Sequence, residues 1–252
     1  EVFAYHIGEN AEWFPTATPA AQFGFLPLIT GTLWVSLFAI LFALPFGLSV
    51  SIYMSEVANP KVRSWLKPII ELLSGIPSVV YGFFGLIVIV PLIQKLFDLP
   101  VGESGLAGSI VLAIMALPTI ITVTEDAMRN CPRAMREASL ALGASQWQTI
   151  YKVVIPYSIS GITSGVVLGI GRAIGETMAV LMVTGNAAVI PTTILEPLRT
   201  IPATIAAELG EAPAGGPHYQ ALFLLGVVLF FITLIINFSV EYISSKGLKR
   251  SK

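Results

Sequence analysis

Residues 26–54 read LPLITGTLWVSLFAILFALPFGLSVSIYM and contain no charged side chain. A helix needs roughly 20 apolar residues to cross the hydrocarbon core of a bilayer, so this stretch is long enough to span one. Further charge-free stretches cover residues 72–94, 104–124, 153–171, 177–195 and 212–240. They lack the apolar–polar alternation of strands in a membrane β-barrel. The pattern predicts an all-α, polytopic membrane helix bundle with five spans, at about 26–54, 72–94, 105–124, 157–184 and 219–243.

The composition also indicates a membrane protein. Of 252 residues, 55% are hydrophobic and 12% are charged, against about 25% charged in an average soluble domain. The net charge of −1 provides no basic surface for nucleic acid. A single cysteine, Cys131, excludes an internal disulfide and a cysteine-rich metal site, and two histidines, His6 and His218, leave little for a metal centre. We therefore predict no metal site and no catalytic residue.

Lysine and arginine gather in three segments, which predicts the orientation of the chain. The segments are residues 61–67, 129–152 and 246–252. Cytoplasmic loops of membrane proteins are enriched in these two residue types, so we place all three segments, and the C-terminus, in the cytoplasm. Residue 1 and the proline-rich loop of residues 185–218 then lie on the outer side of the cytoplasmic membrane. That loop, with a short helical run at 203–209, either binds another protein or caps the bundle.

The first residues of the chain contain no signal that would carry residue 1 to the outer side of the membrane. Residues 1–24 form an acidic, polar segment without an initiator Met and without the basic region that opens a secretory signal peptide. We expect a transmembrane helix to precede residue 1, which would give six spans; a cleaved signal peptide is the alternative. Residues 1–252 otherwise show no repeat and no soluble domain boundary, so we read them as one transmembrane domain.

The fourth predicted span contains Gly161, Gly165 and Gly169, spaced by four along one helix face. Small residues at this spacing allow two membrane helices to approach closely. We expect this face to pack against another helix, of this chain or of a partner subunit.

Residues 125–156, between the third and fourth spans, are predicted to form two short helices on the cytoplasmic side. Pro132 suits a helix start, and residues 133–142 follow as a short helix. Gly143 permits the turn that ends it, and a second helix begins near Ser145 and runs towards the membrane. Together they would form a compact knob able to dock into another protein.

The same segment resembles the EAA motif of ABC importer permeases. That motif is Glu-Ala-Ala, three residues, Gly, nine residues, Ile, one residue and Leu-Pro. This chain has Glu137, Ala138, Gly143 and Pro156 at the matching positions. The departures are mild: Ser139, Val153 and Ile155 replace Ala, Ile and Leu. The resemblance implies that Glu137, Ala138 and Gly143 belong to an ATPase-coupling segment that sits in a separate ATP-binding subunit.

The chain has none of the sequence parts of an ATPase. It contains no Gly-x-x-x-x-Gly-Lys-Ser/Thr loop to hold phosphates. We therefore expect a transport subunit that is not itself an enzyme and holds no cofactor, with ATP and Mg²⁺ bound by the partner ATPase.

Arg172 and Glu176 are charges inside the fourth predicted span, and their spacing of four would place them on one helix face. Each intramembrane charge costs roughly 2.5–3.5 kcal/mol on insertion scales, and such residues are usually functional. A guanidinium group binds phosphate-like oxyanions through two parallel hydrogen bonds. We expect both residues on the substrate pathway, with Arg172 attracting an anion and Glu176 tuning or gating that site. A structural ion pair facing another helix or a partner subunit is the alternative.

Residues 169–180, GIGRAIGETMAV, resemble the PstC family, one of two kinds of membrane subunit in phosphate-specific ABC importers. Residues 74–82, SGIPSVVYG, and 117–122, LPTIIT, look like the same family, and the resemblance extends from about residue 22 to residue 242. It implies a MetI-like permease fold and ATP-driven import of inorganic phosphate. The implied partners are a PstA-like permease subunit, a PstB-like ATPase dimer and a PstS-like phosphate-binding protein.

Other functions remain open at this point. The chain could be the paired PstA-type subunit, or a permease for another oxyanion such as sulfate, molybdate or phosphonate. More distant possibilities are an ion-coupled secondary anion carrier or channel, and a scaffold that senses phosphate without moving it.

Overall fold

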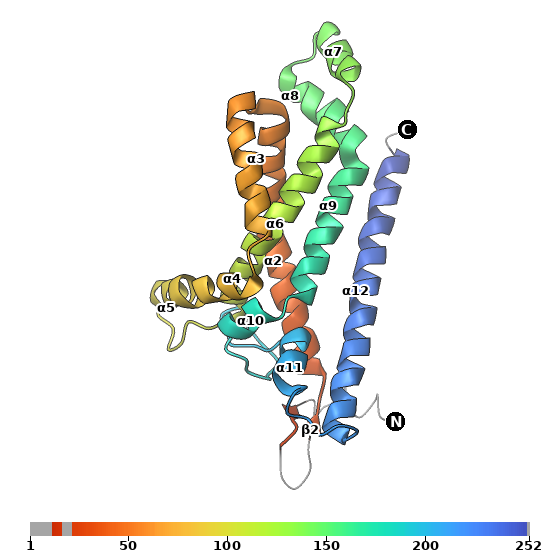
Figure 1. The fold of residues 1–252 in the computed structure, drawn as a ribbon. Helices are drawn as coiled ribbons and strands as arrows, with labels where there is room; N and C mark the ends of the chain where they lie inside the picture. The colour runs from red at the N-terminus through yellow and green to blue at the C-terminus, as the bar shows by residue number, and fades with distance from the viewer. Residues whose placement is uncertain (1–11, 17–21, 251–252) are drawn as a thin grey trace. The chain divides into compact units, whose positions relative to one another are not determined.

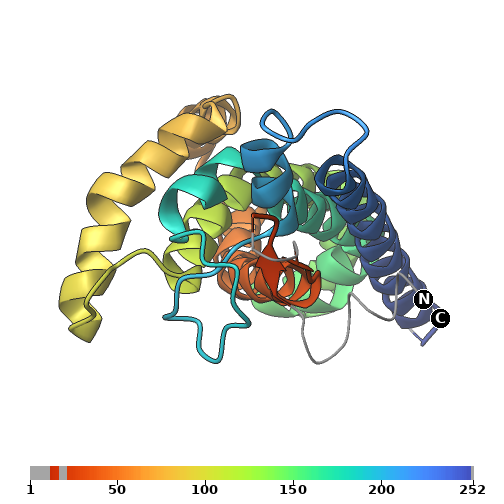
Figure 2. The same cartoon turned by 90° about the horizontal axis from the view of Figure 1, so that it is seen from below.

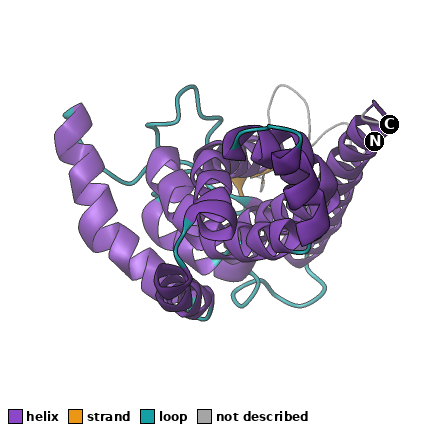
Figure 3. Ribbon diagram, turned by 90° about the horizontal axis from the view of Figure 1, so that it is seen from above, coloured by secondary structure: helices purple, strands orange, loops and turns teal. Residues whose placement is uncertain are grey.

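The computed structural model describes residues 12–16 and 22–250, with side chains through residue 242. Most of this part of the chain is helical (Figure 1; helices purple in Figure 3). Five helices are long and apolar enough to cross a membrane, which confirms the five predicted spans. They are Leu26–Val57, Ser78–Phe97, Gly105–Arg129, Gln146–Gly175 and Pro217–Tyr242. Residues 1–11 and 17–21 of the predicted outer segment lie outside the described residues, and the helix expected before residue 1 stays a prediction.

The chain divides into two compact units, which are described separately here. Unit 1 comprises residues 1–42, 77–114 and 173–234, and unit 2 comprises residues 43–76, 115–172 and 235–252. Helices α2 (Leu26–Ile52), α6 (Gly105–Arg129), α9 (Ile155–Gly175) and α12 (Pro217–Arg250) each contribute to both units.

Unit 2 is built on close contact between α6 and α9. A Cβ atom added to Gly161 would lie 2.3 Å from the Cβ atom of Ala127, and one added to Gly169 would lie 2.7 Å from a side-chain carbon of Ile120. Gly165 is similarly close to Thr124, at 3.0 Å from its hydroxyl oxygen. The expected packing of this glycine face against another helix is confirmed, and the partner is a helix of the same chain.

The shorter helical elements of unit 2 come before α6 or between α6 and α9 in the sequence. Helix α2 ends in a π-helical turn, η1 (Tyr53–Val57), and α3 (Pro60–Ser74) follows. After α6 come α7 (Arg133–Ala141), α8 (Gln146–Thr149) and a second π-helical turn, η3 (Ile150–Val154), which leads into α9. In Figure 1, α7 and α8 project beyond the end of α6.

Unit 1 begins with a two-stranded antiparallel sheet, β1 (Trp13–Phe14) and β2 (Gln22–Phe23), in which Trp13 lies opposite Phe23. Its helical elements are α4 (Ser78–Phe84), η2 (Gly85–Ile89), α5 (Val90–Phe97), α10 (Met178–Val183) and α11 (Ile201–Glu208). Helix α11 confirms the helix predicted near 203–209. A long loop joins α10 to α11 (Figure 2). A buried cluster of Trp13, Phe25, Leu28, Ile201, Leu222 and Leu225 ties the sheet, α2, α11 and α12 together.

Two of the predicted spans had wrong boundaries. The second span starts at Ser78 rather than residue 72, because α3 continues to Ser74 and Pro77 has an extended backbone (φ −59°, ψ 141°) that starts a new helix. The fourth span starts at Gln146 and ends at Gly175 rather than covering 157–184. Glycine is a poor helix former, and after Gly175 the backbone at Thr177 (φ −115°, ψ −62°) departs from helical values before α10 begins.

Candidate functional site

The segment with α7 and α8 forms as its local sequence predicts. Pro132 precedes α7 with an extended backbone, and Gly143 follows it with φ of +84°, a conformation that favours glycine. Ser145 then opens α8 with a capping box. Its hydroxyl accepts a hydrogen bond from the backbone N–H of Gln148 at 3.3 Å, and its own N–H donates to the Gln148 side chain at 2.8 Å.

The residues that match the EAA motif lie on the solvent-exposed side of the segment formed by α7 and α8. Glu137, Ala138 and Gly143 are all exposed. Two large apolar side chains are exposed beside them, Leu142 at 89% and Trp147 at 65%. Apolar side chains gathered on an exposed surface commonly mark a protein contact, so the segment has the properties of a docking surface.

The opposite side of the segment is fastened to unit 2 by polar contacts that the sequence did not reveal. The Arg136 guanidinium donates one hydrogen bond to the Glu56 carboxylate and one to the backbone carbonyl of Met128, each at 2.8 Å. The Gln146 side chain donates to the backbone carbonyl of Glu56 at 3.1 Å. A bond of 2.9 Å between the hydroxyls of Ser139 and Thr149 joins α7 to the end of α8.

A second polar cluster joins α3 to α6. Its centre is Glu125, whose side chain is 1% exposed and forms ion pairs with Arg63 at 2.7 Å, Lys67 at 2.9 Å and, more loosely, Arg129 at 3.8 Å. Partial burial opposes the charge on Lys67, but hydrogen bonds to Asp126 and Glu125 outweigh it and raise its pKa. Basic residues from two of the three predicted cytoplasmic segments therefore meet at this end of unit 2.

Arg172 and Glu176 do not share a helix face, because α9 ends at Gly175; this prediction was wrong. Arg172 is partly buried in the last turn of α9, where a cation suits the negative end of the helix dipole. It makes no hydrogen bond or ion pair with any residue that the structure describes. The Glu176 carboxylate instead accepts a weak hydrogen bond, 3.4 Å long, from the backbone N–H of Ala179 in α10.

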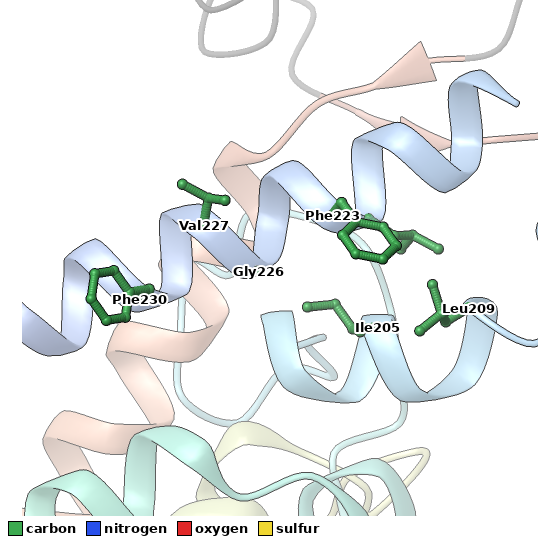
Figure 4. A pocket seen from close by; sticks show the side chains of 7 residues that line it. Ile205, Leu209, Phe223, Gly226, Val227 and Phe230 are labelled. Atoms are coloured by element: carbon green, nitrogen blue, oxygen red, sulfur yellow. The ribbon is translucent and has the colours of Figure 1, made fainter. Parts of the chain in front are cut away.

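An apolar cavity of about 380 Å³ lies between α11 and α12 in unit 1. Figure 4 shows Ile205 of α11 and Leu209, the residue that follows α11, facing it, with Phe223 and Phe230 from α12. This lining offers no charge or hydrogen-bond donor to a small anion. Within residues 12–16 and 22–250, no group of three or more His, Cys, Asp or Glu side chains is placed to hold a metal ion.

The chain is thus a helix bundle with an exposed segment of two short helices between its third and fourth spans. The family described as "Binding-protein-dependent transport system inner membrane component" matches residues 43–247. The chain belongs to this family and is a multi-pass, inner-membrane permease component of an ABC transport system.

Comparison with individual proteins identifies more specific relatives within this family. The chain is 41% identical over 237 residues to a probable ABC transporter permease, YqgH, of Bacillus subtilis, covering 94% of this chain and 76% of that protein. It is 36% identical over 259 residues to the phosphate transport system permease PstC of Mesorhizobium japonicum, covering 95% and 78%. The resemblance to the PstC family is thereby confirmed.

The fold has a counterpart among solved structures. A structure of the MetNI methionine ABC transporter in an inward-facing conformation aligns with a TM-score of 0.64 at 18% identity. The alignment covers 90% of this chain and 96% of that one, which confirms the MetI-like fold.

Proposed function

We propose that the chain is the PstC-type permease subunit of an ATP-driven ABC importer that carries inorganic phosphate across the cytoplasmic membrane. The observation that carries this proposal is its identity of 36–37% to phosphate transport permeases over 90–95% of its length. The substrate is inferred from the names of those relatives, and the chemistry of the chain is compatible with it because Arg172 is a cation without a carboxylate partner among the described residues.

In this proposal, the segment with α7 and α8 docks into a PstB-like ATPase dimer. Exposed Leu142 and Trp147 supply apolar contact area, and Glu137, Ala138 and Gly143 shape the docking surface. ATP and Mg²⁺ bind to the ATPase, so the chain is not itself an enzyme and requires no cofactor of its own.

Arg172 is the proposed attraction point for the anion. A partly buried guanidinium without a fixed counter-ion can exchange one oxyanion for another, whereas a tightly paired one cannot do so without losing its partner. Glu176 lies just beyond the end of α9, and its negative charge would hasten release of an anion that has reached Arg172. The other roles for these two residues, a helix-end charge and a contact with a partner subunit, become outcomes of the test.

The remaining partners follow from the proposed orientation. With residues 61–67 and 129–152 and the C-terminus in the cytoplasm, residue 1 and the loop of residues 185–218 face outwards. A PstS-like binding protein would deliver phosphate at that loop. A PstA-like permease subunit would complete the pathway as the second half of a heterodimer.

The test is uptake of radiolabelled phosphate into proteoliposomes that contain the chain with any preceding native sequence, its PstA-like partner, the ATPase and the binding protein. We expect uptake that requires internal ATP, persists with ionophores and persists with excess sulfate, molybdate or phosphonate. Uptake that ionophores collapse and ATP does not drive would indicate a secondary carrier. ATP-driven uptake blocked by another oxyanion would change the substrate but keep the importer.

Arg172→Ala tests the anion site in the same assay. We expect phosphate uptake to fall by about 100-fold or more, as for loss of a charged hydrogen-bond donor, while the complex still assembles. Lys95→Ala is the matched control, since Lys95 is exposed and has no ion pair in the described part of the chain. Unchanged uptake by an assembled Arg172→Ala complex would show that Arg172 is only a charge at the end of α9 and not an anion site.

A further inference from the structure

The end of α2 has an unusual backbone at the point where α7 and α8 attach. Residues Tyr53–Val57 form the π-helical turn η1, closed by a hydrogen bond of 2.7 Å from the Ala58 N–H to the Tyr53 carbonyl, five residues back. Such turns insert a residue into an α-helix and are frequent at functional sites. Here the turn contains Glu56 and presents it to the docking segment.

Glu56 binds both short helices at once. Its carboxylate accepts a hydrogen bond from Arg136 of α7, while its backbone carbonyl accepts one from Gln146, the first residue of α8. The neighbouring Ser55 hydroxyl donates to the same carboxylate at 2.7 Å. A displacement of either short helix therefore acts on one residue at the end of a membrane-spanning helix.

The ion pair is shielded from water. The side chain of Glu56 is 10% exposed and that of Arg136 is 23% exposed, in contrast to the exposed motif residues beside them. Successive residues of a helix point about 100° apart, so α7 can present Arg136 to η1 and Glu137 to a docked partner. Shielding from solvent also makes the pair less sensitive to salt than a surface ion pair.

The second acceptor of Arg136 extends the connection to another spanning helix. The Met128 carbonyl lies in the last turn of α6, where backbone carbonyls have no partner within the helix. Arg136 therefore joins the ends of α2 and α6 to α7 through one guanidinium group.

We infer that Glu56 and Arg136 are positioning residues that transmit movement of α7 and α8 to α2 and α6, and so couple ATP hydrolysis to phosphate movement. This inference rests on the function proposed above. It concerns the Glu56–Arg136 pair, which joins the segment with α7 and α8 to the rest of unit 2. This pair contacts neither phosphate nor ATP.

The test is the number of phosphate ions imported per ATP hydrolysed by the full reconstituted complex. Glu56→Gln removes the charge but keeps the shape, and we expect this ratio to fall by about five-fold or more, with ATP hydrolysis continuing. Glu56→Asp keeps the carboxylate and should recover part of the ratio. Glu71→Gln is the matched control, because Glu71 is exposed on α3 and has no ion pair within the residues described.

A double-mutant cycle separates coupling from simple folding. Arg136→Gln also loses the contact with the Met128 carbonyl and should lower the ratio at least as far as Glu56→Gln. The double variant should lower it no further than Arg136→Gln, because both changes break the same ion pair. A purely structural role would instead reduce the amount of assembled complex and lower uptake and hydrolysis together. If Glu56→Gln does not assemble, Gln146→Ala removes only the contact from α8 and should lower the ratio by about two-fold.

The outcomes distinguish the inference from the function on which it rests. Absence of ATP-driven uptake by the unmodified complex would overturn both. ATP-driven uptake by the unmodified complex, with an unchanged ratio in the assembled Glu56 or Gln146 variants, would overturn the inference and leave the function standing.

Discussion

A buried carboxylate in one unit and a partly buried carboxylate in the other each bind several donors, and the donors differ in kind. In unit 2, Glu125 is 1% exposed, and its three partners all carry a full charge: Arg63, Lys67 and Arg129. In unit 1, Glu208 is 14% exposed, and its three partners differ in chemistry: Trp13, Arg199 and His218.

The difference separates two ways of stabilising a buried acid. Three cations overcompensate Glu125, so its contribution depends mainly on charge and its loss would leave like charges facing one another. Glu208 accepts hydrogen bonds from the β1 strand and from the loop before α11, and it lies 2.8 Å from the His218 ring on α12. Its contribution depends on geometry, because it joins segments that are far apart in the sequence.

The largest effect should come from removing the charge on Glu125. Glu125→Gln leaves Arg63 without its counter-charge and Lys67 with Asp126 as its only carboxylate partner, and we expect a loss of about 3 kcal/mol, as for other broken buried ion pairs. The measurement is the thermal unfolding midpoint in detergent, compared with Glu71→Gln, which should change stability by less than about 0.5 kcal/mol. Equal midpoints for the two variants would show that the charges do not stabilise unit 2.

Glu208→Gln should have a smaller effect. The amide still accepts from the Trp13 indole but no longer neutralises Arg199, so we expect a loss of about 2 kcal/mol, as for hydrogen bonds to a charged group. Unfolding of the variant is compared with that of Glu211→Gln, an exposed neighbour. A loss as large as that for Glu125→Gln would indicate that charge, rather than geometry, also dominates in unit 1.

His218→Phe tests one hydrogen bond of the Glu208 cluster. The new ring can keep the stacking of His218 on Phe23, whose ring centre is 6.0 Å away, but it cannot bond to Glu208. We expect a loss of about 1 kcal/mol, and His218→Gln, which restores a donor without the ring, identifies how much of it comes from the hydrogen bond. If both variants are as stable as the unmodified protein, the bonds from Trp13 and Arg199 are sufficient to stabilise the Glu208 cluster.

The smallest effect is the pH dependence of Lys67. Its pKa in the folded protein is raised above the ordinary value of 10.5, so its contribution is fully present below that value and disappears as pH rises through the folded pKa. The stability difference between Lys67→Met and the unmodified protein should therefore be constant from pH 7 to about pH 10 and vanish only in stronger alkali. Unfolding midpoints measured across that range test this, and a difference that fades near neutral pH would contradict it.

The features predicted correctly from the sequence are those set by neighbouring residues. Pro132, Gly143 and Ser145 define the ends of α7 and α8 through backbone preferences that operate within a few residues. The five spans follow from apolar stretches of sufficient length. The boundary at residues 75–77 was missed because a window without charges does not register a change of backbone direction. The boundary at residues 175–177 was missed because two charge-free stretches were joined across Arg172 and Glu176.

The polar clusters could not be predicted from local patterns. Glu56 and Arg136 are 80 residues apart, and Arg63 and Glu125 are 62 apart. Only the fold brings them together. One signal was available: Glu56 and Glu125 are acids next to segments rich in lysine and arginine, where a buried carboxylate would find partners. The pairing of Arg172 with Glu176 failed for the opposite reason, since spacing alone assumed an unbroken helix.

The contact of Gly161, Gly165 and Gly169 with α6 also limits where the chain tolerates added residues. One residue inserted between Pro156 and Gly161 would rotate the rest of α9 by about 100° and replace all three glycines at the contact by larger side chains. The exposed turn at residues 210–216 has no comparable dependence on its exact length. A short insertion in that turn should therefore leave the stability of the fold unchanged, whereas α9 must keep its length.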